Sequence, residues 1–243
     1  IFFGFYLIAI YLSAERTSFA LMIIFVSLSF FLIQKFRAIL LKSISILIIF
    51  FLITSIFELG KSQPSKRLFF KTFNQLTNEI FIKKGGEKIT EIKKDKLAKN
   101  LKIFSNDHNG HLKLAYDLFK KNTIFGVGPK GFRHYCRSVN YDSEIGICST
   151  HPHNTLIQIL AETGLIGFLF YISAIFFILF KIFKSYSSYV TQDVKNYFLI
   201  VSIALLINLF PFLPSGNFFN NWISLINFYL VGIYFYAYKK VFV

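Results

Sequence analysis

The chain has 243 residues, of which 54% are hydrophobic and 19% aromatic, and its 33 phenylalanines lie in long apolar blocks. This composition excludes an ordinary soluble domain and indicates an integral membrane protein. The formal net charge of +15 fits either a solvated lysine-rich surface or a field that attracts anionic head groups and pyrophosphates. Nucleic acid is not expected as a partner, because the basic stretch lies between apolar spans.

Six apolar segments predict helices in the lipid bilayer, because about 20 apolar residues in a helix span about 30 Å of hydrocarbon. They lie at about residues 1–14, 17–34, 38–57, 154–181, 196–213 and 218–238. We therefore expect an all-α integral membrane protein, a multi-span helical bundle. The chain opens inside an apolar run, with no starter Met, basic n-region or cleavage site, so we expect a fragment that lacks N-terminal spans.

The polar segment 58–152 predicts a large, mostly helical loop outside the membrane. Within it, residues 83–102 are dense in Lys and Glu and predict an exposed helix or a mobile segment. Residues 110–122 predict an amphipathic helix, with an apolar face formed by Leu112, Ala115, Leu118 and Phe119. His108 and His111, at the front of this helix, are expected to be polar surface residues.

Basic residues in the short connections predict the orientation of the chain. On one side lie Lys35, Arg37, Lys42, Lys181, Lys184, Lys195, Lys239 and Lys240, whereas the connection 210–221 on the other side has no charge. The positive-inside rule places the basic set in the cytoplasm and the 58–152 loop in the periplasm or outside the cell. Arg16, His151 and His153 then share the outer side.

The two cysteines, Cys136 and Cys148, lie 12 positions apart in this loop. They lack the spacing of a metal site, and no third ligand is obvious nearby. In an oxidising compartment we expect them to form one loop-closing disulfide.

Two histidines flank a proline where the polar loop meets the fourth apolar segment. We expect that helix to begin near Pro152, because proline is favoured in a first helical turn. A helix N-terminus favours phosphate and lowers the pKa of a histidine, which leaves a neutral imidazole able to take a proton. His153, and secondarily His151, are therefore candidate catalytic bases; the alternative is polar residues at the membrane interface.

Two ionisable residues lie next to or inside the apolar segments, where an unpaired charge is costly. Arg16 could bind a pyrophosphate in a bidentate way, with two parallel N–H···O hydrogen bonds. Alternatively, its side chain could extend to the membrane interface or pair with Glu15. Glu162 lies nine residues beyond His153 in the chain. It could contact the substrate, although a structural pair with another helix is favoured.

The run Gly126–Gly131 matches the pattern G-x-G-x-x-G, but no strand precedes it and no β-α-β unit surrounds it. We reject a dinucleotide site on this ground and expect a tight loop. Such a loop could bring Arg133 back to the membrane surface as a substrate contact.

His153-Asn154, followed nine residues later by Gly164-Leu165-Ile166-Gly167, resembles the H-N-x9-G-x-x-G signature of O-antigen ligases. The run from His151 to Gly164 is similar to the C-terminal domain that O-antigen ligases share with O-antigen polymerases. Phe125-Gly126-Val127-Gly128-Pro129 resembles the family's upstream loop. The chain departs from the family pattern at Glu15, where the family has serine before its arginine, and at His111, where the family often has arginine.

The resemblance implies a metal-independent membrane glycosyltransferase without a cofactor, at the periplasmic face of a bacterial inner membrane, in lipopolysaccharide biosynthesis. The donor would be a glycan on undecaprenyl pyrophosphate, and the acceptor a lipid A–core sugar for a ligase. His153 would be the base, with His151 as the second catalytic candidate. The candidate substrate contacts are Arg16, Arg133, Asn154 and Glu162. The candidate structural residues are the glycines Gly126, Gly128, Gly164 and Gly167, together with Cys136 and Cys148 from the cysteine spacing above.

Other functions stay open at this point. A polymerase of the same family would use a lipid-linked glycan as acceptor, and a protein O-oligosaccharyltransferase would use a protein. A transporter or flippase component predicts polar residues along several spans and inverted repeats. The apolar segments here are nearly free of ionisable groups, which favours chemistry at the membrane interface.

Overall fold

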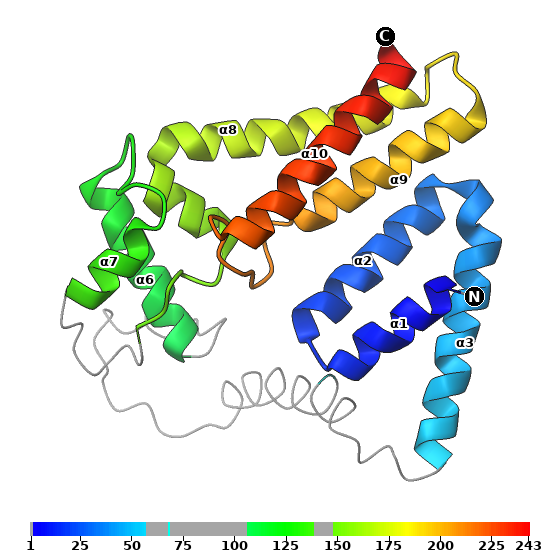
Figure 1. Ribbon diagram of the computed structural model, residues 1–243, viewed down its shortest axis with the longest axis horizontal. Coiled ribbons are helices and arrows are strands. Elements are labelled where there is room, and N and C mark those ends of the chain that lie inside the picture. Colours follow the sequence, from blue (N-terminus) through cyan, green and yellow to red (C-terminus); the bar gives the residue numbers. More distant parts are fainter. Residues whose placement is uncertain (1, 57–67, 69–105, 139–147) are drawn as a thin grey trace, which may run out of the picture. The chain divides into compact units, whose positions relative to one another are not determined.

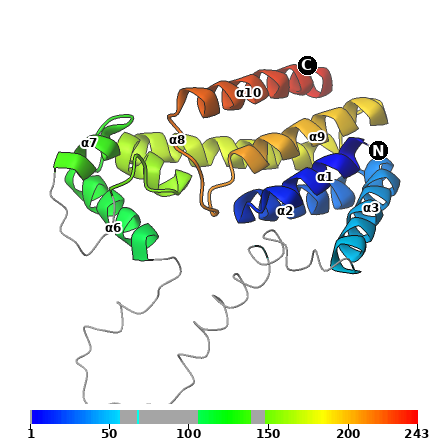
Figure 2. The same cartoon turned by 60° about the horizontal axis from the view of Figure 1, so that its bottom comes forward.

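The computed structural model describes residues 2–56, 68, 106–138 and 148–243, and this part of the chain is helical without a β-strand (Figures 1 and 2). The predicted all-α class is confirmed for these residues. The chain divides into two compact units, Ile1–Lys96 and Leu97–Val243. The predicted segment 83–102 lies outside the described residues.

The first unit contains α1 (Phe2–Ser13), α2 (Arg16–Leu32), the short 3₁₀ helix η1 (Gln34–Phe36) and α3 (Arg37–Ile56). α1 turns into α2 at Ala14, which has a left-handed φ of 57°. This conformation is uncommon for a residue other than glycine.

The helices of this unit pack through aromatic side chains and a small residue. The ring of Tyr11 in α1 is buried and meets the rings of Phe50 and Phe51 in α3 edge-on, at centroid distances of 6.3 and 6.1 Å. Gly4 of α1 lies close enough to Ile46 that an added Cβ would be 3.4 Å from its side chain. Apolar packing therefore holds α1 against α3.

The second unit is built on three long helices, α8 (Thr155–Ser185), α9 (Gln192–Asn208) and α10 (Asn221–Phe242), in which α9 runs antiparallel to α10 beside it (Figure 1). The Phe198 ring lies 5.6 Å from Tyr234 and 5.5 Å from Phe242. The buried face of α9 includes Phe198, Leu199 and Ile203, which are fully buried.

Two short helices, α6 (Asn106–Lys121) and α7 (Gly131–Ser138), pack against the first part of α8. Their shared core contains Leu114, Ala115, Leu118, Phe132, Cys136 and Ala161. α6 is amphipathic, as predicted, but the predicted face was wrong in part. The buried positions are 110, 111, 114, 115 and 118, whereas Leu112 and Phe119 are only half-buried.

Two helices are long and apolar enough to cross a membrane, Gln34–Ile53 and Thr155–Ser185. Many of their large apolar side chains are exposed, among them Leu52, Phe170, Phe176 and Phe180. A helix that faces lipid presents such a surface. That all six predicted segments cross a bilayer stays a prediction.

Candidate functional site

The first turn of α8 is fixed by Asn154, which is its N-cap. The side-chain oxygen of Asn154 accepts a hydrogen bond from the backbone N–H of Ile157 at 3.1 Å, which satisfies one of the free donors of the helix. Its side-chain nitrogen donates to the carbonyl of Pro211 at 3.1 Å. The helix thus begins at Thr155 and not near Pro152 as predicted, and the amide of Asn154 is engaged in structural bonds.

The connection between α9 and α10 holds the segment before α8 in place. The backbone N–H of Ser215 donates to the carbonyl of His153 at 3.0 Å, and Thr155 Oγ1 donates to Ser215 Oγ at 2.7 Å. These contacts join positions about 60 residues apart in the chain, so the sequence gives no local sign of them. They fix the backbone on both sides of His153.

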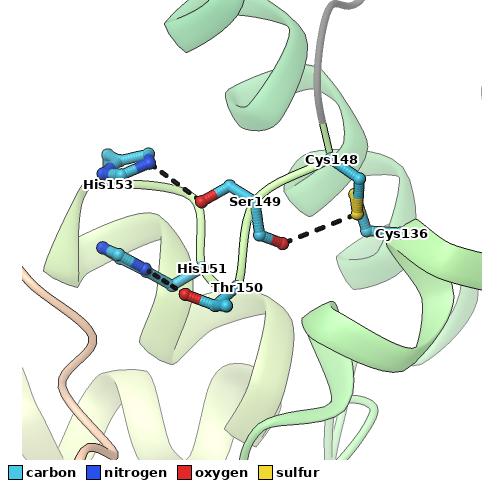
Figure 3. Close-up of a disulfide and its surroundings, with 6 residues drawn as sticks. All are labelled: Cys136, Cys148, Ser149, Thr150, His151 and His153. Carbon is cyan, nitrogen blue, oxygen red and sulfur yellow. Dashed lines mark hydrogen bonds between the residues drawn. A yellow bond between two sulfur atoms is a disulfide. The ribbon is translucent and has the colours of Figure 1, made fainter.

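His153 has a left-handed φ of 58°. Such strained residues cluster at functional sites, where the surrounding contacts hold them. Its ring nitrogen Nε2 lies 2.9 Å from Ser149 Oγ (Figure 3). The ring lies 4.2 Å from that of His151 and 5.6 Å from that of His111, measured between centroids. Three imidazoles therefore meet at the start of α8.

The tautomer of His151 follows from its contacts. Nε2 lies 3.2 Å from the carbonyl oxygen of Ser215, which can only accept, so Nε2 carries the hydrogen. Nδ1 then accepts the hydroxyl of Thr150 at 3.0 Å. Burial lowers the pKa of His151, the bond to Ser215 opposes this, and the charges of His111 and Arg133 lower the pKa further. His151 is therefore neutral with its lone pair engaged, which favours His153 as the base.

His111 lies in this cluster, although the sequence predicted a polar surface residue. That prediction was wrong, because the side chain is only 4% exposed and its ring lies 6.3 Å from that of Phe132. A signal was present in the sequence. Position 111 precedes 114, 115 and 118 at helical spacing and belongs to the buried stripe of α6.

Arg133 of α7 contributes positive charge near the imidazoles. Its guanidinium acts on the pKa of His151. Its Nε atom is buried and makes no hydrogen bond within the described part of the chain. The structure therefore places the charge of Arg133 beside the histidines, and its role as a substrate contact stays a prediction, whereas the next arginine, Arg137, is exposed.

A kink in α8 explains two of the predicted structural glycines. Gly164 has φ 65° and ψ −164°, a combination open almost only to glycine. The kink frees the carbonyl of Glu162, which accepts from the N–H of Gly128 at 2.9 Å, and the N–H of Leu165, which donates to Thr123 at 2.8 Å. The glycine-rich loop 123–128 therefore supplies hydrogen-bond partners for the backbone groups of α8 that the kink leaves without helical partners.

The close approach of these two backbones also requires the glycines. A Cβ on Gly126 would lie 2.6 Å from the backbone nitrogen of Gly164, and a Cβ on Gly164 would collide with the carbonyl of Ile124. Gly128 has a positive φ of 90°. A Cβ on Gly167 would collide with the side chain of Thr163.

Glu162 is fully buried in a polar network. Its carboxylate accepts from the N–H of Phe132 at 3.0 Å, at the start of α7, and from Gln158 Nε2 at 3.0 Å. Gln158 also donates to Asn217 at 2.7 Å and accepts from the N–H of Phe218. The network connects α7, α8 and the connection before α10, which favours the structural alternative for Glu162.

The disulfide expected from the sequence is present. Cys136 of α7 and Cys148 are bonded, with their Cα atoms 5.8 Å apart (Figure 3). Because Cys148 directly precedes Ser149, the disulfide anchors the histidine segment to α7.

Arg16 is the first residue of α2 and is half-buried. It belongs to the first compact unit and the histidines to the second, so its convergence with His153 stays a prediction. In the described residues, no group of three or more His, Cys, Asp or Glu side chains is placed to hold a metal ion.

Comparison with known proteins gives one match. A family model described as O-antigen ligase matches residues 1–172, which include Arg16, His111, Arg133, His153 and Gly164. No curated protein and no solved structure matches the chain.

Proposed function

The chain belongs to the O-antigen ligase family, and from this premise we propose that it is an O-antigen ligase. It transfers a glycan from undecaprenyl pyrophosphate to a lipid A–core sugar at the periplasmic face of the inner membrane. The observation that carries the proposal is the position of His153 in the family's His-Asn motif, beside two further imidazoles and the charge of Arg133. A polar cluster of this kind at the end of an apolar helix suits chemistry at a membrane interface.

His153 acts as the general base of the transfer. It takes the proton of the acceptor hydroxyl, whose oxygen attacks the anomeric carbon of the donor sugar. The bond from that carbon to the pyrophosphate breaks, and undecaprenyl pyrophosphate leaves with the electron pair. Arg133, whose buried Nε has no partner in the described part of the chain, stabilises the leaving charge together with Arg16.

The test of the base is His153→Ala in the full-length protein, with labelled lipid-linked glycan and lipid A–core as substrates. We expect transfer to fall at least about 100-fold, the usual contribution of a general base. The matched control is His134→Ala, because His134 is an exposed histidine of α7. Transfer that is unchanged in His153→Ala excludes His153 as the base.

The acceptor is tested in a deletion strain through its surface polysaccharide. A ligase predicts uncapped core and accumulation of lipid-linked polymer. Core capped with a single repeat unit would instead identify a polymerase of the same family, and an unchanged pattern would point to another acceptor, such as a protein.

A further inference from the structure

Ser149 is in direct contact with the proposed base, although the sequence analysis did not select it. Its Oγ lies 2.9 Å from Nε2 of His153, and its side chain is half-buried (Figure 3). The residue before it, Cys148, is bonded to Cys136 of α7. The hydroxyl therefore comes from a short segment with a covalent anchor at one end and the start of α8 at the other.

The ring of His153 has several neighbours that could take its hydrogen bonds or change its charge. Among the described residues they include His151 in the same segment, His111 of α6, and, through its charge on His151, Arg133 of α7. The backbone of His153 is held by Ser215, but this contact does not determine which ring nitrogen carries the hydrogen. The contact between Ser149 Oγ and Nε2 is tied to the tautomer, because a serine hydroxyl can either accept from Nε2–H or donate to a bare Nε2.

We propose that Ser149 is a positioning residue for His153: its hydroxyl accepts the hydrogen bond of Nε2–H and leaves Nδ1 as the nitrogen that takes the acceptor proton. This rests on the proposed function of His153. During transfer the proton moves from the acceptor oxygen to Nδ1, while Nε2–H stays bonded to Ser149. The bond to Ser149 strengthens as the imidazolium forms, since a charged donor bonds more strongly.

The disulfide extends this arrangement to α7. Cys136 is 5% exposed within the core shared by α6, α7 and α8, and the first turn of α7 is bonded to buried Glu162. Cys148 is thereby attached to a fixed element. A dithiol reagent that reduces the disulfide to two thiols, and is itself oxidised, removes this anchor.

The kinetic test compares Ser149→Ala, Ser149→Thr and the control Ser187→Ala, in which Ser187 is an exposed serine after α8. In Ser149→Ala we expect kcat to fall about tenfold, the effect of one hydrogen bond, with KM for the lipid-linked donor unchanged. Ser149→Thr keeps the hydroxyl and restores most of kcat, and Ser187→Ala matches the wild type. Reduction by the dithiol lowers kcat of the wild type but has little further effect on Ser149→Ala.

The pH profile separates positioning from a merely structural role. Loss of the acceptor at Nε2 destabilises the imidazolium, so the pKa of the base falls and the acidic limb of the kcat/KM profile moves to lower pH in Ser149→Ala. The threonine variant keeps the wild-type limb. An unchanged limb together with unchanged kcat contradicts the proposal, as does a threonine variant that is no better than alanine.

Nitrogen-15 NMR of the histidine-labelled protein gives a readout that does not depend on activity. The His153 signals, identified by their loss in His153→Ala, should show the Nε2–H tautomer in the wild type and a mixture in Ser149→Ala. An Nδ1–H tautomer in the wild type overturns the inference. If His153→Ala keeps full transfer activity, the proposed function fails and with it the role of Nδ1 as base, whereas the NMR result separately decides whether Ser149 holds the tautomer of His153.

Discussion

The neutral form of His151 is part of the folded structure around the site. Burial lowers its pKa below the ordinary value of 6.5, and the charges of His111 and Arg133 act in the same direction. The unfolded chain therefore binds a proton at this position more readily than the folded one. The contribution of His151 to the free energy of unfolding is therefore fully present above about pH 6.5. It is lost as the pH falls below that value toward the lower pKa of the folded state.

This pH dependence is testable with His151→Gln, which cannot titrate. We expect the midpoint of thermal unfolding of the wild type to decrease between about pH 7 and pH 5, and the decrease to be smaller in the variant. The exposed His134→Gln serves as control and should keep the wild-type slope. Equal slopes in the wild type and His151→Gln would show that His151 has the same pKa in both states.

Glu162 provides the second prediction at the scale of one residue. Glu162→Ala leaves the N–H of Phe132 and the amide of Gln158 without their partner in the core, which costs about 1–3 kcal/mol of the free energy of unfolding. Glu162→Gln keeps an acceptor oxygen and should lose less. Thermal unfolding of the purified protein in detergent measures both, and an alanine variant as stable as the wild type would contradict the structural role.

At the scale of the elements, the kink in helix α8 depends on the backbone conformation of Gly164. Gly164→Ala would place a Cβ against the carbonyl of Ile124 in a conformation that suits glycine alone. We expect a loss of at least about 1–3 kcal/mol, the cost of such a backbone conformation. The control is Gly232→Ala, because an added Cβ there meets nothing within 4 Å.

The outcome is read from the temperature of unfolding and from the yield of folded protein. The Gly232 variant should be neutral or slightly stabilised, since alanine favours a helix interior over glycine. If Gly164→Ala behaves like Gly232→Ala, the contact between the glycine loop and the kink does not form.

The long apolar helices could be predicted from the sequence because apolar segments and polar breaks are local signals, whereas the short helix α7 was not predicted. α8, for example, covers residues 155–185 where 154–181 was predicted. The separate expectation of a start near Pro152 was wrong, because Asn154 supplies the cap and bonds Pro211. A cap that also bonds a distant loop has no signature in the local pattern.

The candidate site could be predicted only in part. The His-Asn motif identified His153, and the spacing of two cysteines indicated the disulfide that the structure contains. The buried position of His111 was missed although the helical spacing of α6 indicated it, whereas Ser149 was missed because its contact with His153 depends on how α7 and the start of α8 meet. Such contacts between elements follow from packing and not from periodicity.

At the scale of the whole molecule, the account requires Arg16 and His153 to face the same compartment. The two residues belong to different compact units, and the distribution of basic residues predicts that both lie outside the cytoplasm. A lipid-linked pyrophosphate can be bound and cleaved in one site only if this holds.

The most direct measurement is the labelling of single added cysteines with a membrane-impermeant maleimide in intact spheroplasts. The variants are Arg16→Cys, His153→Cys and, for the cytoplasmic side, Lys184→Cys. The native cysteines do not react with the maleimide because they are disulfide-bonded. The account predicts labelling at positions 16 and 153 in intact cells, and at position 184 only after permeabilisation. Labelling of positions 16 and 153 from opposite faces would contradict it.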